Sequence, residues 1–79
     1  MPGIEKTGNR THDAAVLASE VTLQTALAGN PTQATVNAAY VVHFKAVRDS
    51  AIANNLPSVA AYFDQAQRAL ASRGNATPA

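Results

Sequence analysis

The sequence predicts an all-α fold, a small three-helix bundle with helices at about 12–28, 31–54 and 57–72. Three observations carry this prediction. Apolar residues recur every three to four positions within each stretch, the period that places them on one face of a helix. Glycine and proline fall at the ends of the stretches. Eighteen of the 79 residues are alanine, which has the strongest intrinsic preference for helix.

The first helix should begin near Thr11, a good N-cap residue, with Asp13 in the first turn where the helix dipole favours an acid. It should end before Gly29, because glycine readily adopts the left-handed backbone that follows many helices. Large apolar residues cover a broad arc of this helix, and small uncharged residues cover its other side. The arc holds Val16, Leu17, Val21, Leu23 and Leu27, and the other side holds Ala15, Ala18, Ser19, Thr22, Thr25 and Ala26.

The second helix should be the longest and the central one. Asn30, Pro31 and Gln33 form a helix start, with an Asn-x-x-Gln capping box and proline at the first helical position. No glycine or proline follows before Pro57, so about 24 residues can form one helix of roughly 36 Å. Two apolar stripes indicate neighbours on more than one side. One stripe is Val36, Tyr40, Phe44, Val47 and Ala51, with His43 beside it, and the other is Ala39, Val42, Ala46 and Ala53.

The third helix should start at Pro57 or Ser58 and continue to about Ser72, with Gly74 beyond its end. Residues 11–73 then form one helical domain, and residues 1–10 and 74–79 are expected to be flexible tails. We identify no internal repeat. The apolar stripe of the third helix is Val59, Phe63, Ala66 and Leu70, and the spacing predicts surface ion pairs Lys45–Asp49 and Asp64–Arg68.

The composition predicts association. The chain has 18 alanines against 19 larger apolar residues. Alanine buries little area, and area carries the hydrophobic free energy at about 25 cal/mol per Å². Such a chain forms helices readily but builds a thin core, and small domains with thin cores commonly need disulfides, a metal or a partner. Cysteine is absent and no metal-site spacing is present, so a partner is the remaining expectation.

Charge and hydropathy argue against several classes of function. A net charge of +1 with 14% charged residues argues against a nucleic-acid binder that neutralises phosphates. No apolar run approaches the roughly 18–20 residues that span a bilayer, so we expect no membrane partner. The first six residues lack the apolar region of a signal peptide, so we expect cytoplasmic synthesis without a signal peptide.

No residue set predicts catalysis, so we expect a protein that is not an enzyme and has no catalytic, cofactor-binding or metal site and no small-molecule substrate. His43 borders the apolar stripe of the second helix, which favours a half-buried, hydrogen-bonded histidine over a metal ligand. His12, beside Asp13, is expected to lie on the surface of the first turn. No serine has the glycines of a nucleophile elbow, and the glycines form no phosphate-binding loop.

A small helix-turn-helix DNA-binding regulatory protein is the alternative. Three helices with short turns are the usual scaffold of that class, and the third helix would be the recognition helix. The basic residues do not gather on one element, however, so solvated surface charge is the favoured interpretation. They are Lys6, Arg10, Lys45, Arg48, Arg68 and Arg73.

The stretch 35–55 resembles small uncharacterised helical proteins encoded among phage and prophage structural genes. The resemblance lies in Tyr40, in Phe44-Lys45, in Ala53-Asn54-Asn55, and in Phe63 of the next helix. Those proteins commonly end in a Leu-Gly element, whereas this chain has Leu-Ala-Ser-Arg-Gly at 70–74. The resemblance implies a context and no functional residue: a virion or assembly component, located in the virion if the chain is phage-encoded.

The sequence therefore predicts a non-enzymatic helical interaction or assembly module that acts by packing, in a homo-oligomer or with another protein such as a virion protein. Two small-residue faces are expected to meet the partner, because both are uncharged and three helices cannot easily cover both. The predicted partner-binding residues are Ala15, Ala18 and Thr22 on the first helix and Ala39, Val42 and Ala46 on the second.

Overall fold

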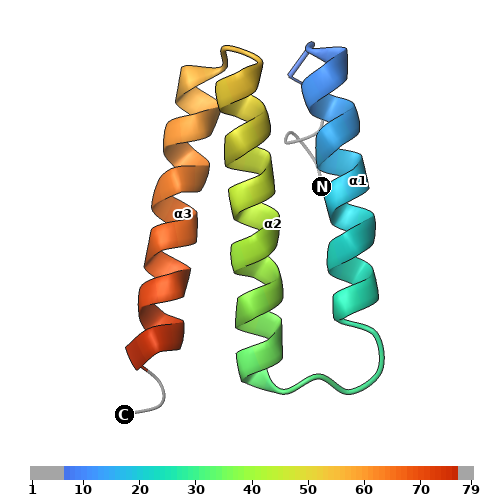
Figure 1. Cartoon of the computed structure of the whole chain (residues 1–79), viewed down its shortest axis with the longest axis vertical. Coiled ribbons are helices and arrows are strands. Elements are labelled where there is room, and N and C mark those ends of the chain that lie inside the picture. Colours follow the sequence, from blue (N-terminus) through green and yellow to red (C-terminus); the bar gives the residue numbers. More distant parts are fainter. Residues whose placement is uncertain (1–6, 77–79) are drawn as a thin grey trace.

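A computed structural model describes residues 7–76 and consists of three α-helices: α1 (Arg10–Ala26), α2 (Gln33–Ala53) and α3 (Pro57–Ala76). Successive helices run antiparallel, with α2 between α1 and α3 (Figure 1). Within the described residues there is no strand, and the backbones of α1 and α3 do not approach each other. The predicted all-α, three-helix fold is thereby confirmed. The outer parts of the predicted tails, 1–6 and 77–79, lie outside the described residues.

α1 begins two residues earlier than the sequence predicts. Its N-cap is Asn9 rather than Thr11, and the Asn9 side-chain oxygen accepts the N–H of His12 at 2.9 Å. The carboxylate of Asp13 accepts hydrogen bonds from the backbone N–H and the hydroxyl of Thr7. These bonds tie the residue that precedes the N-cap segment to the first turn of the helix. The helix ends at Ala26, and Gly29 has the predicted left-handed backbone (φ +81°) but lies in the loop rather than at the helix end.

α2 begins at a different cap from the predicted one. Thr32 is the N-cap, and its hydroxyl oxygen accepts the N–H of Thr35 at 3.2 Å. The Asn-x-x-Gln box at Asn30 therefore does not form, because a capping hydroxyl stands two residues nearer the helix body. Gln33 donates instead to the side chain of Asn37 at 2.8 Å. The shift lengthens the loop between α1 and α2.

The connection from α2 to α3 is short. Asn55 takes a left-handed backbone (φ 62°), the N–H of Leu56 donates to the carbonyl of Ala51 at 2.8 Å, and that of Asn55 donates to Ile52 at 3.2 Å. This pair of hydrogen bonds is a Schellman motif, and Pro57 then starts α3 at its first position. α3 continues to Ala76 through residues 74–76, which the sequence analysis assigned to the tail.

The core follows the predicted stripes and is thin. Phe44 and Val59 pack against a cluster of Val16, Val47 and Phe63, which takes one residue from each helix. The rings of Phe44 and Phe63 lie 5.7 Å apart between α2 and α3. The buried apolar side chains of the described residues are Val16, Leu23, Val47, Ala51 and Phe63.

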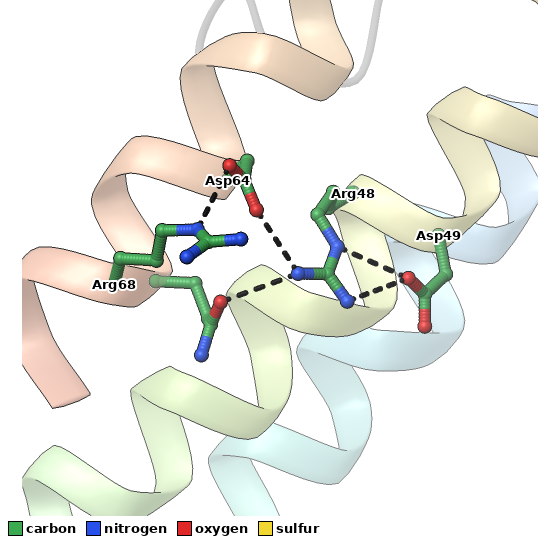
Figure 2. Close-up of polar contacts among 5 residues, drawn as sticks. Arg48, Asp49, Asp64 and Arg68 are labelled. Atoms are coloured by element: carbon green, nitrogen blue, oxygen red, sulfur yellow. Dashed lines mark hydrogen bonds and ion pairs between the residues drawn. The ribbon is translucent and has the colours of Figure 1, made fainter.

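A charged network closes the rim of the α2–α3 interface (Figure 2). Arg48 donates to Asp64 at 3.1 Å and to Gln67 at 3.3 Å, so one α2 side chain contacts two α3 side chains. Arg68 forms the predicted ion pair with Asp64 at 3.0 Å. Asp49 pairs with its neighbour Arg48 at 3.0 Å, so the predicted pair with the lysine four residues earlier does not form.

Hydrogen bonding in this network shifts two pKa values. The hydrogen bond from Arg48, followed by that from Arg68, holds the pKa of Asp64 below its ordinary value. Hydrogen bonds to Asp49 and then to Asp64 raise the pKa of Arg48. Both groups are therefore charged throughout the neutral and mildly acidic range, and the network stays intact there.

Candidate interaction surface at the α1–α2 pair

Two histidine–serine pairs are buried in the α1–α2 interface. His12 of α1 and His43 of α2 are 0% and 1% exposed. His12 Nδ1 lies 2.8 Å from Ser50 Oγ of α2, and His43 Nδ1 lies 2.7 Å from Ser19 Oγ of α1. Each helix therefore supplies one histidine and one serine. The histidine belongs to α1 in the first pair and to α2 in the second.

This reciprocity comes from an internal repeat. Both helices carry His-x-x-Ala-Val-x-x-Ser, at 12–19 in α1 and at 43–50 in α2, 31 positions later. Seven residues make about two helical turns, so the histidine, valine and serine of each copy share one face. In an antiparallel pair these faces meet head to tail, with Val16 and Val47 buried between the two polar pairs. The sequence analysis found no repeat, and that interpretation was wrong.

The prediction for His12 was also wrong. The expected surface residue is buried, because the cap at Asn9 makes His12 the third helical residue and places it opposite Ser50. His43 is hydrogen-bonded as predicted, but it is fully rather than half buried. The missed signal was the equal spacing of histidine, alanine, valine and serine in two helices, which individual inspection of each histidine does not detect.

The burial of His43 favours its neutral form. Burial lowers the pKa of His43, and the negative charge of Glu20 and a hydrogen bond to the Ser19 backbone offset this only in part. Nδ1 of each ring has a serine partner, whereas Nε2 of His12 and Nε2 of His43 are buried without a hydrogen-bond partner among the described residues. Both imidazoles are thus polar groups buried inside a helix–helix interface.

The Ser19–His43 contact has the composition of a nucleophile and its base but not the surroundings of a hydrolytic site. Acyl transfer also needs hydrogen-bond donors for the developing oxyanion, usually backbone N–H groups. Ser19 and His43 lie in the interior of α1 and α2, where backbone N–H groups belong to the helical hydrogen bonds. The same type of contact occurs again between His12 and Ser50. A repeated histidine–serine pair is expected of a motif that packs two helices together.

Beside the second pair, α1 and α2 leave a hollow of about 280 Å³ between them. We call it the α1–α2 hollow. It lies toward the end of the two helices that the α1–α2 loop joins. Within the described residues, its lining contains no aspartate, glutamate, lysine or arginine. It is lined by Ser19, Thr22, Leu23 and Ala26 of α1 and by Thr35, Ala38, Ala39, Val42 and His43 of α2.

The structure brings the two predicted partner-binding faces to the same side of the α1–α2 pair. Each face has the spacing i, i+3, i+7, which keeps its members within one arc of the helix. Thr22, Ala39 and Val42 line the hollow, and Val42 is 60% exposed at its rim. The remaining predicted residues continue these arcs, with Ala18 and Ala46 exposed and Ala15 partly buried.

α1 also exposes large apolar side chains on its other flank. Leu17 is 55% and Val21 is 64% exposed. The residues 31 positions later in α2 are Arg48, which pairs with Asp64 of α3, and Ile52, which is 62% exposed. Within the described residues α2 contacts both other helices, whereas α1 contacts α2 alone among the helices.

Comparisons with protein-family models, with curated proteins and with solved structures find no match to this chain. Between residues 7 and 76, no helix combines the length and apolar character needed to cross a membrane. In the same part of the chain, no three histidine, cysteine, aspartate or glutamate side chains gather as ligands for a metal ion.

Proposed function

We propose that the protein is a helical interaction module that self-associates through the face containing the α1–α2 hollow. The observation that carries the proposal is the hollow itself, an uncharged depression with exposed Val42 at its rim. Exposed Ala18 and Ala46 lie one helical turn from Thr22 and Val42 on the same helix faces. Small side chains let another helix approach closely, and a hollow of this size admits one large apolar side chain from it. A second copy that associates through the same face supplies such a side chain, because its Val42 is 60% exposed there.

The phage context is a further part of the proposal and is supported by the resemblance of residues 35–55 alone. In that context the module would be a structural or accessory component of a virion. The packing chemistry is the same in a free oligomer and in a particle, so the first test concerns association rather than context.

The decisive measurement is molar mass by light scattering behind a sizing column, across a range of protein concentrations. We expect a dimer or larger species for the natural chain. Ala18→Glu and Ala46→Glu should shift it to monomer, because each places a charge on the proposed face without changing a buried residue. Ala69→Glu is the matched control, since Ala69 is exposed on α3 away from the hollow. A natural chain that is monomeric at all concentrations contradicts self-association.

The helix-turn-helix alternative gains no support from the arrangement. α2 and α3 lie side by side as an antiparallel hairpin (Figure 1), whereas the two helices of a DNA-reading unit cross at about 90–120°. Arg48 and Arg68 form ion pairs with Asp49 and Asp64, and these pairs compete with any contact to DNA phosphates. Binding to duplex DNA that weakens steeply with added salt would favour this alternative over the packing module.

A further inference from the structure

The α1–α2 interface and the α2–α3 interface differ in how protonation affects them. The first contains His12 and His43, both buried, each with one nitrogen hydrogen-bonded to a serine of the other helix. The second is held by the Phe44–Phe63 contact and by ion pairs at its rim. Histidine is the side chain whose ordinary pKa, about 6.5, places its charge change in the mildly acidic range.

We propose that the α1–α2 interface is a proton-sensitive joint, in which protonation of the buried His43 releases α1 from α2 while the α2–α3 hairpin stays packed. This regulation of the fold does not depend on the proposed self-association. The ring of His43 is 1% exposed, lies in the interface and is hydrogen-bonded across it to Ser19.

Protonation disrupts this arrangement for a reason that the geometry shows. A neutral imidazole satisfies Nδ1 with the serine hydroxyl and leaves Nε2 buried without a partner. An imidazolium carries N–H groups on both nitrogens and a full charge, so the closed interface holds an unpaired donor and an unsolvated charge. When α1 separates, water solvates the ring. The proton comes from solvent and no other bond changes.

Acidic groups near the rings oppose the effect without removing it. Glu20 of α1 stabilises a charge on His43, yet burial still dominates and the pKa of His43 is lowered. Asp13, next to His12, is engaged with Thr7. From α3, Asp64 is held by Arg48 and Arg68. The other residues lining the hollow beside His43 are uncharged.

The sign and the window follow from the lowered pKa of His43. Its neutral ring contributes stability above the ordinary value near 6.5, and this is lost as the pH falls from 6.5 through the lower value of the folded state. In that window protonation of His43 raises the opening constant of α1 about tenfold per pH unit. The pKa of Asp64 is lowered, so the α2–α3 ion pairs do not titrate there.

The test is segment-resolved amide hydrogen exchange on the full chain between pH 7.5 and 5.0, corrected for intrinsic exchange rates. We expect exchange in α1 to accelerate at least tenfold on acidification and exchange in α3 near Phe63 to change less than twofold. His43→Asn keeps a hydrogen-bonding group near the position of Nδ1 and does not titrate, so it should abolish the acceleration.

Three results would overturn the proposal. Exchange in α1 that does not depend on pH would show that the rings do not open the interface. Equal acceleration in α1 and α3 would show global unfolding instead. An unchanged pH dependence in His43→Asn would assign it to other groups. If this variant loses helicity at pH 7.5, NMR titration of the His43 ring carbons in the natural chain replaces it, and a His43 that titrates without loss of α1 protection contradicts the proposal.

Discussion

α2 has two neighbours and holds them by different chemistry. Toward α3 it presents aromatic and aliphatic side chains, with Arg48 and Asp64 paired at the rim. Toward α1 it presents His43 and Ser50, neutral polar groups that meet their own counterparts. The first interface is held by apolar contacts with ion pairs at its rim, whereas the buried polar groups of the second are satisfied only when both hydrogen bonds form. Apolar burial therefore carries the α2–α3 contact, and specific polar pairing positions α1.

The largest loss of stability is expected when the aromatic centre of the α2–α3 interface is removed. Phe63 is 3% exposed and packs on Phe44. Phe63→Ala should lower the free energy of unfolding by about 3–5 kcal/mol, because it removes buried area and leaves a cavity. Urea denaturation followed by circular dichroism measures the loss. Tyr62→Ala is the control, since Tyr62 is 66% exposed, and a loss as large as that of Phe63→Ala would contradict the assigned core.

A smaller loss is expected when one hydrogen-bond partner in the α1–α2 interface is removed. Ser19→Ala leaves Nδ1 of the buried His43 without its partner, which should cost about 1–3 kcal/mol of unfolding free energy. Ser50→Ala should cost a similar amount, because the repeat gives His12 the equivalent environment. Ser72→Ala, at an exposed position of α3, serves as the matched control. Losses at Ser19 and Ser50 that equal the control would show that the pairs contribute nothing to stability.

The smallest effect concerns the charged rim. Asp64→Asn removes the acceptor of two ion pairs, yet these are solvated, so the loss should be smaller than that of Ser19→Ala and should shrink with added salt. Urea denaturation at low and high salt checks both statements. The companion substitution Asp49→Asn touches the neighbour of Arg48 without contacting α3, and it should leave stability nearly unchanged.

Local signals predicted the elements, and the contacts between elements explain what they missed. Periodicity located the stripe of Phe44, Val47 and Ala51, of which the last two are buried and Phe44 partly buried, because the helical period alone fixes which residues share a face. The caps shifted by two residues because Asn9 and Thr32 compete with neighbouring capping residues of similar strength.

The histidine–serine pairs were beyond local reasoning. The burial of His12 depends on Ser50, 38 residues away, and a sequence gives no direct sign of which helix faces meet. The repeat was the available signal. By contrast, the small-residue faces at Thr22 and Ala39 were recognisable from composition, and the structure places both beside the hollow. Their role in binding a partner stays a prediction.

The order of the helices along the chain has a consequence for synthesis on the ribosome. α1 emerges first, but the serine that pairs with His12 follows 38 residues later. At about 5–20 residues per second, His12 waits about 2–8 s for its partner. During that interval the His-x-x-Ala-Val-x-x-Ser face of α1 is uncovered, and a nascent chain beside it on the same message carries the same face. Translation speed through residues 13–50 therefore sets how long each new chain is open to pairing with its neighbour.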